Sequence, residues 1–200
     1  MRRHNKYYDL SYITNSKNVK ISPPFSWYTI VCTWFYIGRI PIAPGTLGAI
    51  AAYPLYYLLL ISSLDANQAI YSLFIVLIFL TIISHFAIKK FQKVTNTFDH
   101  RSIVVDEVIG QLLTLAISFK WLYSISTWIN LPYHDLHVSF VIALIAFRYF
   151  DIKKPFFIGY IDRRWKNSFS VLLDDILAAL LASCVIYVGY FIYGNIRGYI

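Results

Sequence analysis

The chain has 200 residues, of which 58% are hydrophobic and 14% are charged, with a formal net charge of +8 at pH 7. Its mean hydropathy of +0.56 lies far above that of ordinary soluble domains, which excludes a soluble globular fold and indicates an integral membrane protein. The basic balance predicts contact with anionic lipid headgroups. Nucleic acid is not expected as a partner, because the Lys and Arg residues are spread over several loops without a recognised nucleic-acid motif.

The chain begins with a polar segment and continues as one membrane domain. Residues 1–24 are polar and basic and contain no apolar stretch of signal-peptide length, so we expect a retained cytoplasmic tail. Residues 25–200 are expected to form a single helical membrane domain. Its first segment, Phe25–Ile37, is apolar and aromatic but shorter than the roughly 20 residues that cross a bilayer, which predicts an interfacial or re-entrant helix.

Apolar segments then alternate with polar turns. Two prolines and three glycines in Gly38–Gly48 break any helix there, and Thr46 is a plausible N-cap for the helix that follows. Ser102 is placed to cap the third helix. The expected spans are Leu47–Leu64, Gln68–Ile88, a third that ends near Trp128, the short Val138–Phe150, and Val171–Tyr193. The prediction is an all-α polytopic membrane protein with about four to five membrane helices plus the short N-terminal one.

The distribution of positive charge predicts the orientation. If the N-terminus is cytoplasmic, every Lys and Arg except Lys120 and Arg197 falls on the cytoplasmic side, as the positive-inside rule requires. We therefore expect the polar loops and the acidic helix starts to meet at the cytoplasmic face.

Two acidic pairs enter apolar segments. Asp106 and Glu107, the only glutamate of the chain, precede the third span, and Asp174 and Asp175 begin the fifth. Charges at the edge of a low-dielectric region are costly, so these pairs are candidates for function rather than simple helix-end charges. Small residues, among them Gly110, follow each pair and allow close approach of the two helices. Pooled carboxylates of this kind suit Mg²⁺, which prefers oxygen ligands.

Basic residues supply the complementary half of a phosphate site. Arg148, Asp151 and Lys154 recur at i, i+3 and i+6, along one side of a helix if that helix continues to Pro155. Guanidinium groups match phosphate oxygens, and the helix start at Pro44, Gly45 and Thr46 offers backbone N–H groups. Together these residues predict phosphate-ester chemistry at a membrane surface, in which a carboxylate serves as general base. A simpler interpretation of Asp151 is that it only forms salt bridges with the neighbouring basic residues. The simpler interpretation of Arg163 is that it anchors the chain at the membrane surface.

Four blocks of the chain resemble the phosphatidylglycerophosphatase A family of bacterial inner-membrane lipid phosphatases. They are Gly38–Gly48 (GRIPIAPGTLG), residues 99–110 (DHRSIVVDEVIG), residues 147–163 (FRYFDIKKPFFIGYIDR) and Leu172–Ala179 (LLDDILAA), in the family's order. The resemblance implies Mg²⁺-dependent hydrolysis of phosphatidylglycerophosphate to phosphatidylglycerol and phosphate, at the cytoplasmic face of the inner membrane.

The resemblance also implies roles for individual residues. Its catalytic candidates are Asp106, Glu107, Asp174 and Asp175, which are also metal ligands together with Asp151. Arg148, Lys154, Gly45, Thr46 and Arg163 would bind phosphate, and Asp99, Asp162, Gly110 and Pro44 would support them. The chain departs from the family at Lys166–Ser170, where a glycine-rich segment is usual, so the loop there must differ.

Two readings from other classes compete with a lipid phosphatase. A small transporter or cation channel would use the carboxylates as an ion path near the membrane centre. A non-catalytic scaffold for lipid synthesis would tolerate Asp106→Asn. The position of Asp106 near a span end disfavours the ion path.

Overall fold

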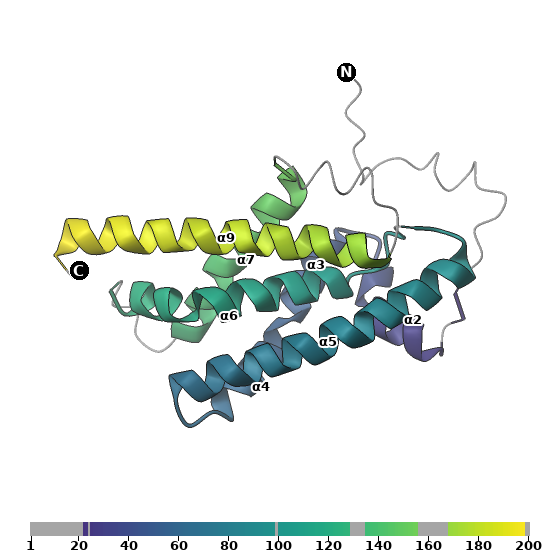
Figure 1. The fold of residues 1–200 in the computed structure, drawn as a ribbon, viewed down its shortest axis with the longest axis horizontal. Coiled ribbons are helices and arrows are strands. Elements are labelled where there is room, and N and C mark those ends of the chain that lie inside the picture. Colours follow the sequence, from purple (N-terminus) through teal and green to yellow (C-terminus); the bar gives the residue numbers. More distant parts are fainter. Residues whose placement is uncertain (1–21, 24, 99, 129–134, 156–167, 199–200) are drawn as a thin grey trace, which may run out of the picture.

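The described part of the chain folds into a bundle of helices. The computed structural model describes residues 22–23, 25–98, 100–128, 135–155 and 168–198, whose regular structure is helical throughout. Three long helices, α5 (Ala66–Thr95), α6 (Val105–Trp128) and α9 (Ser168–Arg197), lie side by side, and α7 (Asp135–Lys153) crosses behind α6 and α9 (Figure 1). The all-α prediction is confirmed, whereas the proposed tail falls almost wholly outside the described residues.

Within the described residues, four helical segments are long and apolar enough to cross a membrane. They are Pro44–Ile61, Ala66–Thr95, Val105–Ile125 and Ser168–Arg197. The helix that contains the predicted fourth span, α7, is not among them because it carries Asp135, Arg148, Asp151 and Lys153 within 19 residues. The count lies at the lower end of the predicted four to five.

The first predicted span is two shorter helices. Helix α3 (Pro44–Ala51) and helix α4 (Tyr53–Ile61) meet at Ala52, since Pro54 has no N–H to donate to the preceding turn. The predicted N-cap at Thr46 was wrong. Ala43 takes that position, and Pro44 occupies the first helical turn, where its missing N–H costs nothing.

Other helix boundaries also differ from the prediction. Helix α5 passes Lys89 and Lys90 and continues to Thr95, because charged side chains end an apolar span without ending a helix. Ser102 is not the cap of α6, which begins at Val105. Its Oγ lies 2.7 Å from His100 Nδ1 instead. Helix α9 begins at Ser168, so Asp174 and Asp175 lie about two turns inside it rather than at its start.

The N-terminal segment is anchored to the start of α6. Helix α2 (Trp27–Cys32) and the 3-10 helix η1 (Ile37–Arg39) are both short, in agreement with a segment that does not span. The Val104 N–H donates to the Cys32 carbonyl at 2.9 Å. This bond fixes the residues that immediately precede Asp106.

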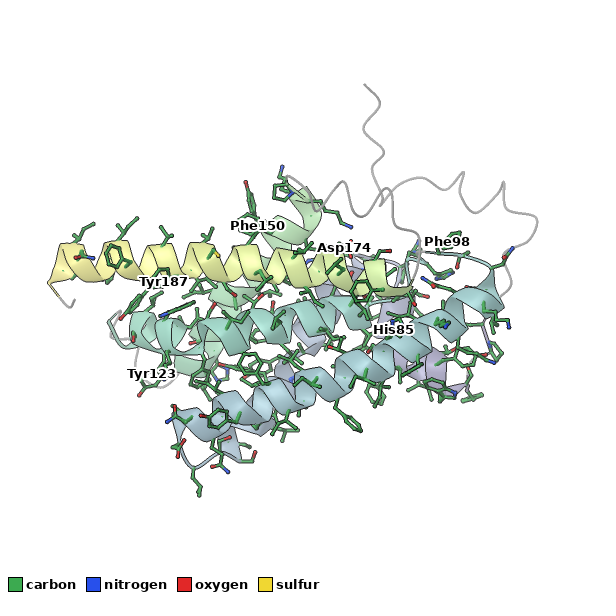
Figure 2. The ribbon with its side chains drawn as sticks, viewed as in Figure 1. His85, Phe98, Tyr123, Phe150, Asp174 and Tyr187 are labelled. Carbon is green, nitrogen blue, oxygen red and sulfur yellow. The ribbon has the colours of Figure 1, made fainter. Side chains whose placement is uncertain are left out.

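The bundle has two distinct ends. Figure 2 shows Asp174, His85 and Phe98 toward one end, and Tyr123 and Tyr187 toward the other. We call the first the site end, because α5 ends there while α6 and α9 begin there (Figure 1).

Gly110 marks the point where three helices meet. A Cβ added to Gly110 of α6 would lie 2.4 Å from Phe147 Cε2 of α7 and 3.2 Å from the Asp175 carbonyl oxygen of α9. Ala178, Ala179 and Ala182 of α9 are fully buried beside Phe147. Only small residues permit this crossing, and the crossing brings the ends of α6, α7 and α9 together.

We expect Gly110→Ala to destabilise the protein by about 1–3 kcal/mol, because the new methyl group overpacks against the Phe147 ring. Unfolding of the purified protein in detergent measures the effect. Gly189→Ala is the matched control, since no atom lies within 4 Å of a Cβ added at this α9 position. An equal loss of stability in Gly189→Ala and in Gly110→Ala would contradict the close helix crossing at Gly110.

Candidate active site

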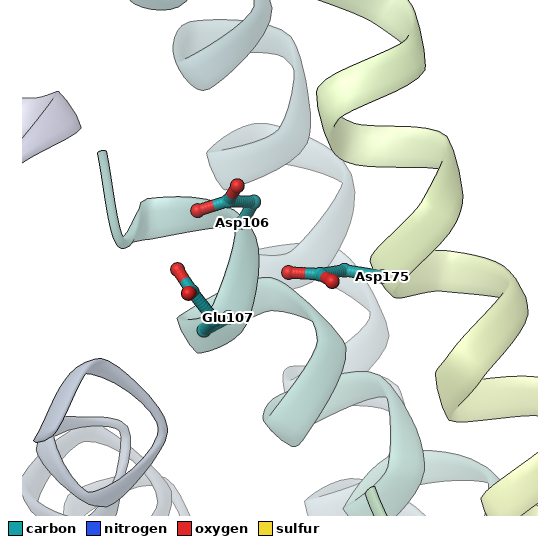
Figure 3. Close-up of side chains that lie close together, drawn as sticks. All are labelled: Asp106, Glu107 and Asp175. Atoms are coloured by element: carbon teal, nitrogen blue, oxygen red, sulfur yellow. The ribbon is translucent and has the colours of Figure 1, made fainter. Parts of the chain in front are cut away.

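Three carboxylates from two helices gather at the site end. Asp106 and Glu107 lie in the first turn of α6, and Asp175 points from α9 toward them (Figure 3). One oxygen from each lies within 4.8 Å of the others. Asp106 and Asp175 are buried, and the Glu107 side chain is 16% exposed. The helix crossing at Gly110 therefore pools acids that neighbouring helical positions alone would point apart.

The fourth predicted acid faces a different partner. Asp174 is buried and forms an ion pair with Lys154 Nζ. Asp151 pairs with Arg148 in the same way. Both residues were predicted as metal ligands, but the structure groups neither with the three clustered carboxylates and places each beside a cation.

Arg148 lies between Glu107 of the carboxylate cluster and Asp151 of its own helix. Its side chain is 8% exposed, and its Nη1 lies 4.0 Å from Glu107 Oε1 as well as beside Asp151. A guanidinium held by carboxylates on two helices has a fixed direction, which suits a planar phosphate contact.

Lys154 lies just beyond the end of α7. The helix ends at Lys153, so the condition that it continues to Pro155 is not met, and Lys154 has a left-handed backbone with φ of 42°. Its N–H still donates to the Phe150 carbonyl at 2.8 Å. This turn directs the ammonium group to Asp174 on α9.

The start of α3 closes the site. Pro44 and Gly45 are buried, and a Cβ added to Gly45 would lie 2.3 Å from Glu107 Oε1 and 3.2 Å from both Arg148 terminal nitrogens. Glycine is therefore required for this approach. Gly45 and Thr46 lie in the first helical turn, so their N–H groups have no helical acceptor and remain available to a ligand.

The residues present fit a divalent cation. Among the described residues, the site brings together five acidic side chains, Asp106, Glu107, Asp151, Asp174 and Asp175, and two basic ones, Arg148 and Lys154. Glu107 Oε2 is buried and has no hydrogen-bond partner among the described residues. Clustered carboxylate oxygens that need positive charge match the preference of Mg²⁺.

Some predicted residues lie outside the described part, and one contact was missed. Asp99, Asp162 and Arg163 fall outside the described residues. Gly48 packs on Val104, a contact that was not predicted, and a Cβ added to Gly48 would lie 2.8 Å from the Val104 Cβ. The spacing of Gly45 and Gly48, three residues apart on one helix face, was the available signal.

Comparison with known proteins identifies the family. The family model for phosphatidylglycerophosphatase A matches residues 30–190. The chain belongs to this family. As a member of the phosphatidylglycerophosphatase A family it is a phosphatase, and its apolar helices make it a membrane protein.

Curated relatives agree with this assignment. A phosphatidylglycerophosphatase A of Haemophilus influenzae is 33% identical over 162 residues, covering 79% of this chain and 85% of the relative. That of Escherichia coli is 31% identical over 170 residues, covering 84% and 85%. A Bacteroides thetaiotaomicron protein named "Putative phosphatidylinositol-3-phosphatase" is 29% identical over 170 residues, covering 82% and 94%. No solved structure matches the chain.

We expect the purified protein to bind a divalent cation through the three-carboxylate cluster. Titration with Mg²⁺ or Mn²⁺, followed by calorimetry, should show binding in the wild type and a loss of at least about tenfold in affinity in Asp175→Asn, since one charged ligand is removed. Asp65→Asn is the control. Asp65 caps α5 outside the cluster by accepting from Gln68 N–H, a role that asparagine also fills. Equal affinity in wild type and Asp175→Asn would refute the cluster as a metal site.

Proposed function

We propose that the protein is a Mg²⁺-dependent phosphatase that hydrolyses phosphatidylglycerophosphate to phosphatidylglycerol and phosphate in phospholipid biosynthesis. The single observation that supports this most is the three-carboxylate cluster of Asp106, Glu107 and Asp175 beside Arg148. The family match and the names of two relatives supply the substrate.

Asp106, Glu107 and Asp175 would hold the metal ion. When bound, Mg²⁺ neutralises phosphate charge and makes a water more acidic. Asp151 and Asp174 lie beside the two cations, and in the proposal they position Arg148 and Lys154 rather than bind metal.

The phosphate group would lie between the carboxylate cluster and the basic side chains. Arg148 presents two parallel donors to phosphate oxygens, while Lys154 adds a point charge. The Gly45 and Thr46 N–H groups at the start of α3 donate to the same group. A carboxylate of the cluster accepts the proton of the attacking water, and the lipid alcohol leaves with a proton from solvent.

The proposed location is the cytoplasmic face of the bacterial inner membrane. Lys89, Lys90 and Lys93 lie near the end of α5, at the site end of the bundle. The positive-inside rule associates such a cluster with the cytoplasm. Asp106 at the start of α6 is thus within reach of a lipid headgroup, which supports a phosphatase over an ion path through the membrane centre.

One relative suggests a second substrate. The Bacteroides protein carries a name that refers to a phosphatidylinositol 3-phosphate activity. That lipid is also a phosphate monoester on a glycerophospholipid headgroup, and the contacts described above recognise the phosphate rather than the alcohol. Both lipids therefore belong in the same assay.

We expect phosphate release from phosphatidylglycerophosphate in mixed micelles with Mg²⁺, and a fall in kcat of at least about a hundredfold in Asp106→Asn, because a charged group of the reacting cluster is lost. Removal of the metal with EDTA should abolish release, and added Mg²⁺ should restore it. Asp65→Asn serves as control. If wild type releases no phosphate from phosphatidylglycerophosphate, phosphatidylinositol 3-phosphate or other phospholipid monoesters, the proposal fails.

We expect Arg148→Lys to lower kcat/KM by about tenfold to a hundredfold, because lysine keeps the charge but loses the paired donors of the guanidinium. Arg197→Lys, at the last turn of α9 and far from the site, should leave kcat/KM unchanged. A steady-state assay of phosphate release compares the two. Full activity in Arg148→Lys would show that only the charge matters.

A further inference from the structure

An apolar groove lies beside the α3–α4 segment. It has a volume of about 710 Å³. Its walls come from the turn after α2, from α3 and α4, and from α7, with Trp34, Phe35, Ile50, Tyr53, Leu58 and Phe140 among the lining residues. It is open on one side, where Phe35 and Leu58 are 67% and 58% exposed.

The groove wall is held in a costly backbone conformation. Trp34, Phe35 and Tyr36 have φ values of 43°, 54° and 71° in succession, a left-handed region that residues with a Cβ seldom occupy. The Trp34 Nε1–H donates to the Ala51 carbonyl at 3.1 Å. This bond joins the turn to the end of α3 beside the interruption at Ala52.

Helix α3 connects the groove to the candidate active site. Its first turn places Gly45 against Glu107 and Arg148, and Ile50, about 7.5 Å further along the helix, lines the groove. Leu58 of α4 lies at most roughly 20 Å beyond Gly45, the length that a straight continuation of α3 would reach. That length corresponds to the headgroup layer plus one leaflet of chains, since a bilayer's hydrocarbon core is about 30 Å thick.

We propose that this groove binds an acyl chain of the phospholipid substrate, so that the enzyme recognises the tail together with the phosphate. The inference rests on the proposed function. A phospholipid whose phosphate contacts Arg148 has its headgroup next to the start of α3, and the groove lies further along α3 and α4.

A second, smaller groove is the alternative binding site for the acyl chain. It has a volume of about 280 Å³ and is lined by residues of α5, α6 and α9, including Ile78, Ile109 and Ile176. No residue of α3 or α7, the helices that carry Gly45 and Arg148, lines it. The larger groove is therefore the one that shares helices with the phosphate contacts.

Substitution of matched positions distinguishes the grooves. Leu58 and Ile78 are apolar residues of membrane helices with exposed fractions of 58% and 61%, one in each groove. Leu58→Trp should raise KM for a substrate with two sixteen-carbon chains by about tenfold, since the indole occupies the groove and removes the van der Waals contacts of the chain there. A substrate with six-carbon chains does not reach Leu58, so its KM should change less than about twofold, and Ile78→Trp should alter neither substrate.

Several outcomes overturn the proposal. They are equal effects of Leu58→Trp on both substrates, no effect on either, or the chain-length effect in Ile78→Trp instead. Phosphate release by wild type from the six-carbon substrate reports the proposed function separately. If that release is absent, the function fails; if it is present without the Leu58 effect, only the groove assignment fails.

Photolabelling of the wild type tests the proposal without depending on the folding of a variant. Phosphatidylglycerol with a diazirine at the end of one chain is irradiated with the protein in nanodiscs, and labelled peptides are mapped. Labels concentrated in α4 support the groove. Labels concentrated in α5, or spread evenly over the membrane helices, refute it.

Discussion

The fold depends on one electrostatic constraint, which is that three carboxylates lie within 4.8 Å of one another at the end of an apolar bundle. Such a cluster is stable in ionised form only when positive charge balances it. Arg148 and Lys154 supply part of that charge, but each is shared with a further acid. Among the described residues the acids of this site outnumber the bases, and a bound cation would supply further positive charge.

The helices are arranged so that this cluster forms at one point. Asp106 and Glu107 come from α6, Asp175 from α9, and Arg148 from α7, and the three helices meet where Gly110 leaves room for the Phe147 ring. Gly45 brings α3 against Glu107 and Arg148 by the same device. The glycines therefore determine how closely the charges of α6, α7 and α9 approach one another and the start of α3.

Much of this arrangement could be predicted from the sequence. The hydropathy of the chain gave the helical membrane class, and the paired acids, together with the family resemblance, gave most of the charged residues. The partner of each charge could not be predicted. Whether Asp174 joins Asp175 or faces Lys154 depends on how α7 and α9 are rotated against each other, which no local pattern encodes. Helix ends were missed for a related reason, since the start of α6 is held by the Cys32 carbonyl, a distant partner.

The left-handed backbone at Lys154 couples occupancy of the site to the end of α7. A residue with a long side chain pays about 1–2 kcal/mol for this conformation, and the ion pair with Asp174 offsets that cost. A ligand that draws the ammonium group away from Asp174 removes the compensation, so the last turn of α7 gains freedom to rewind.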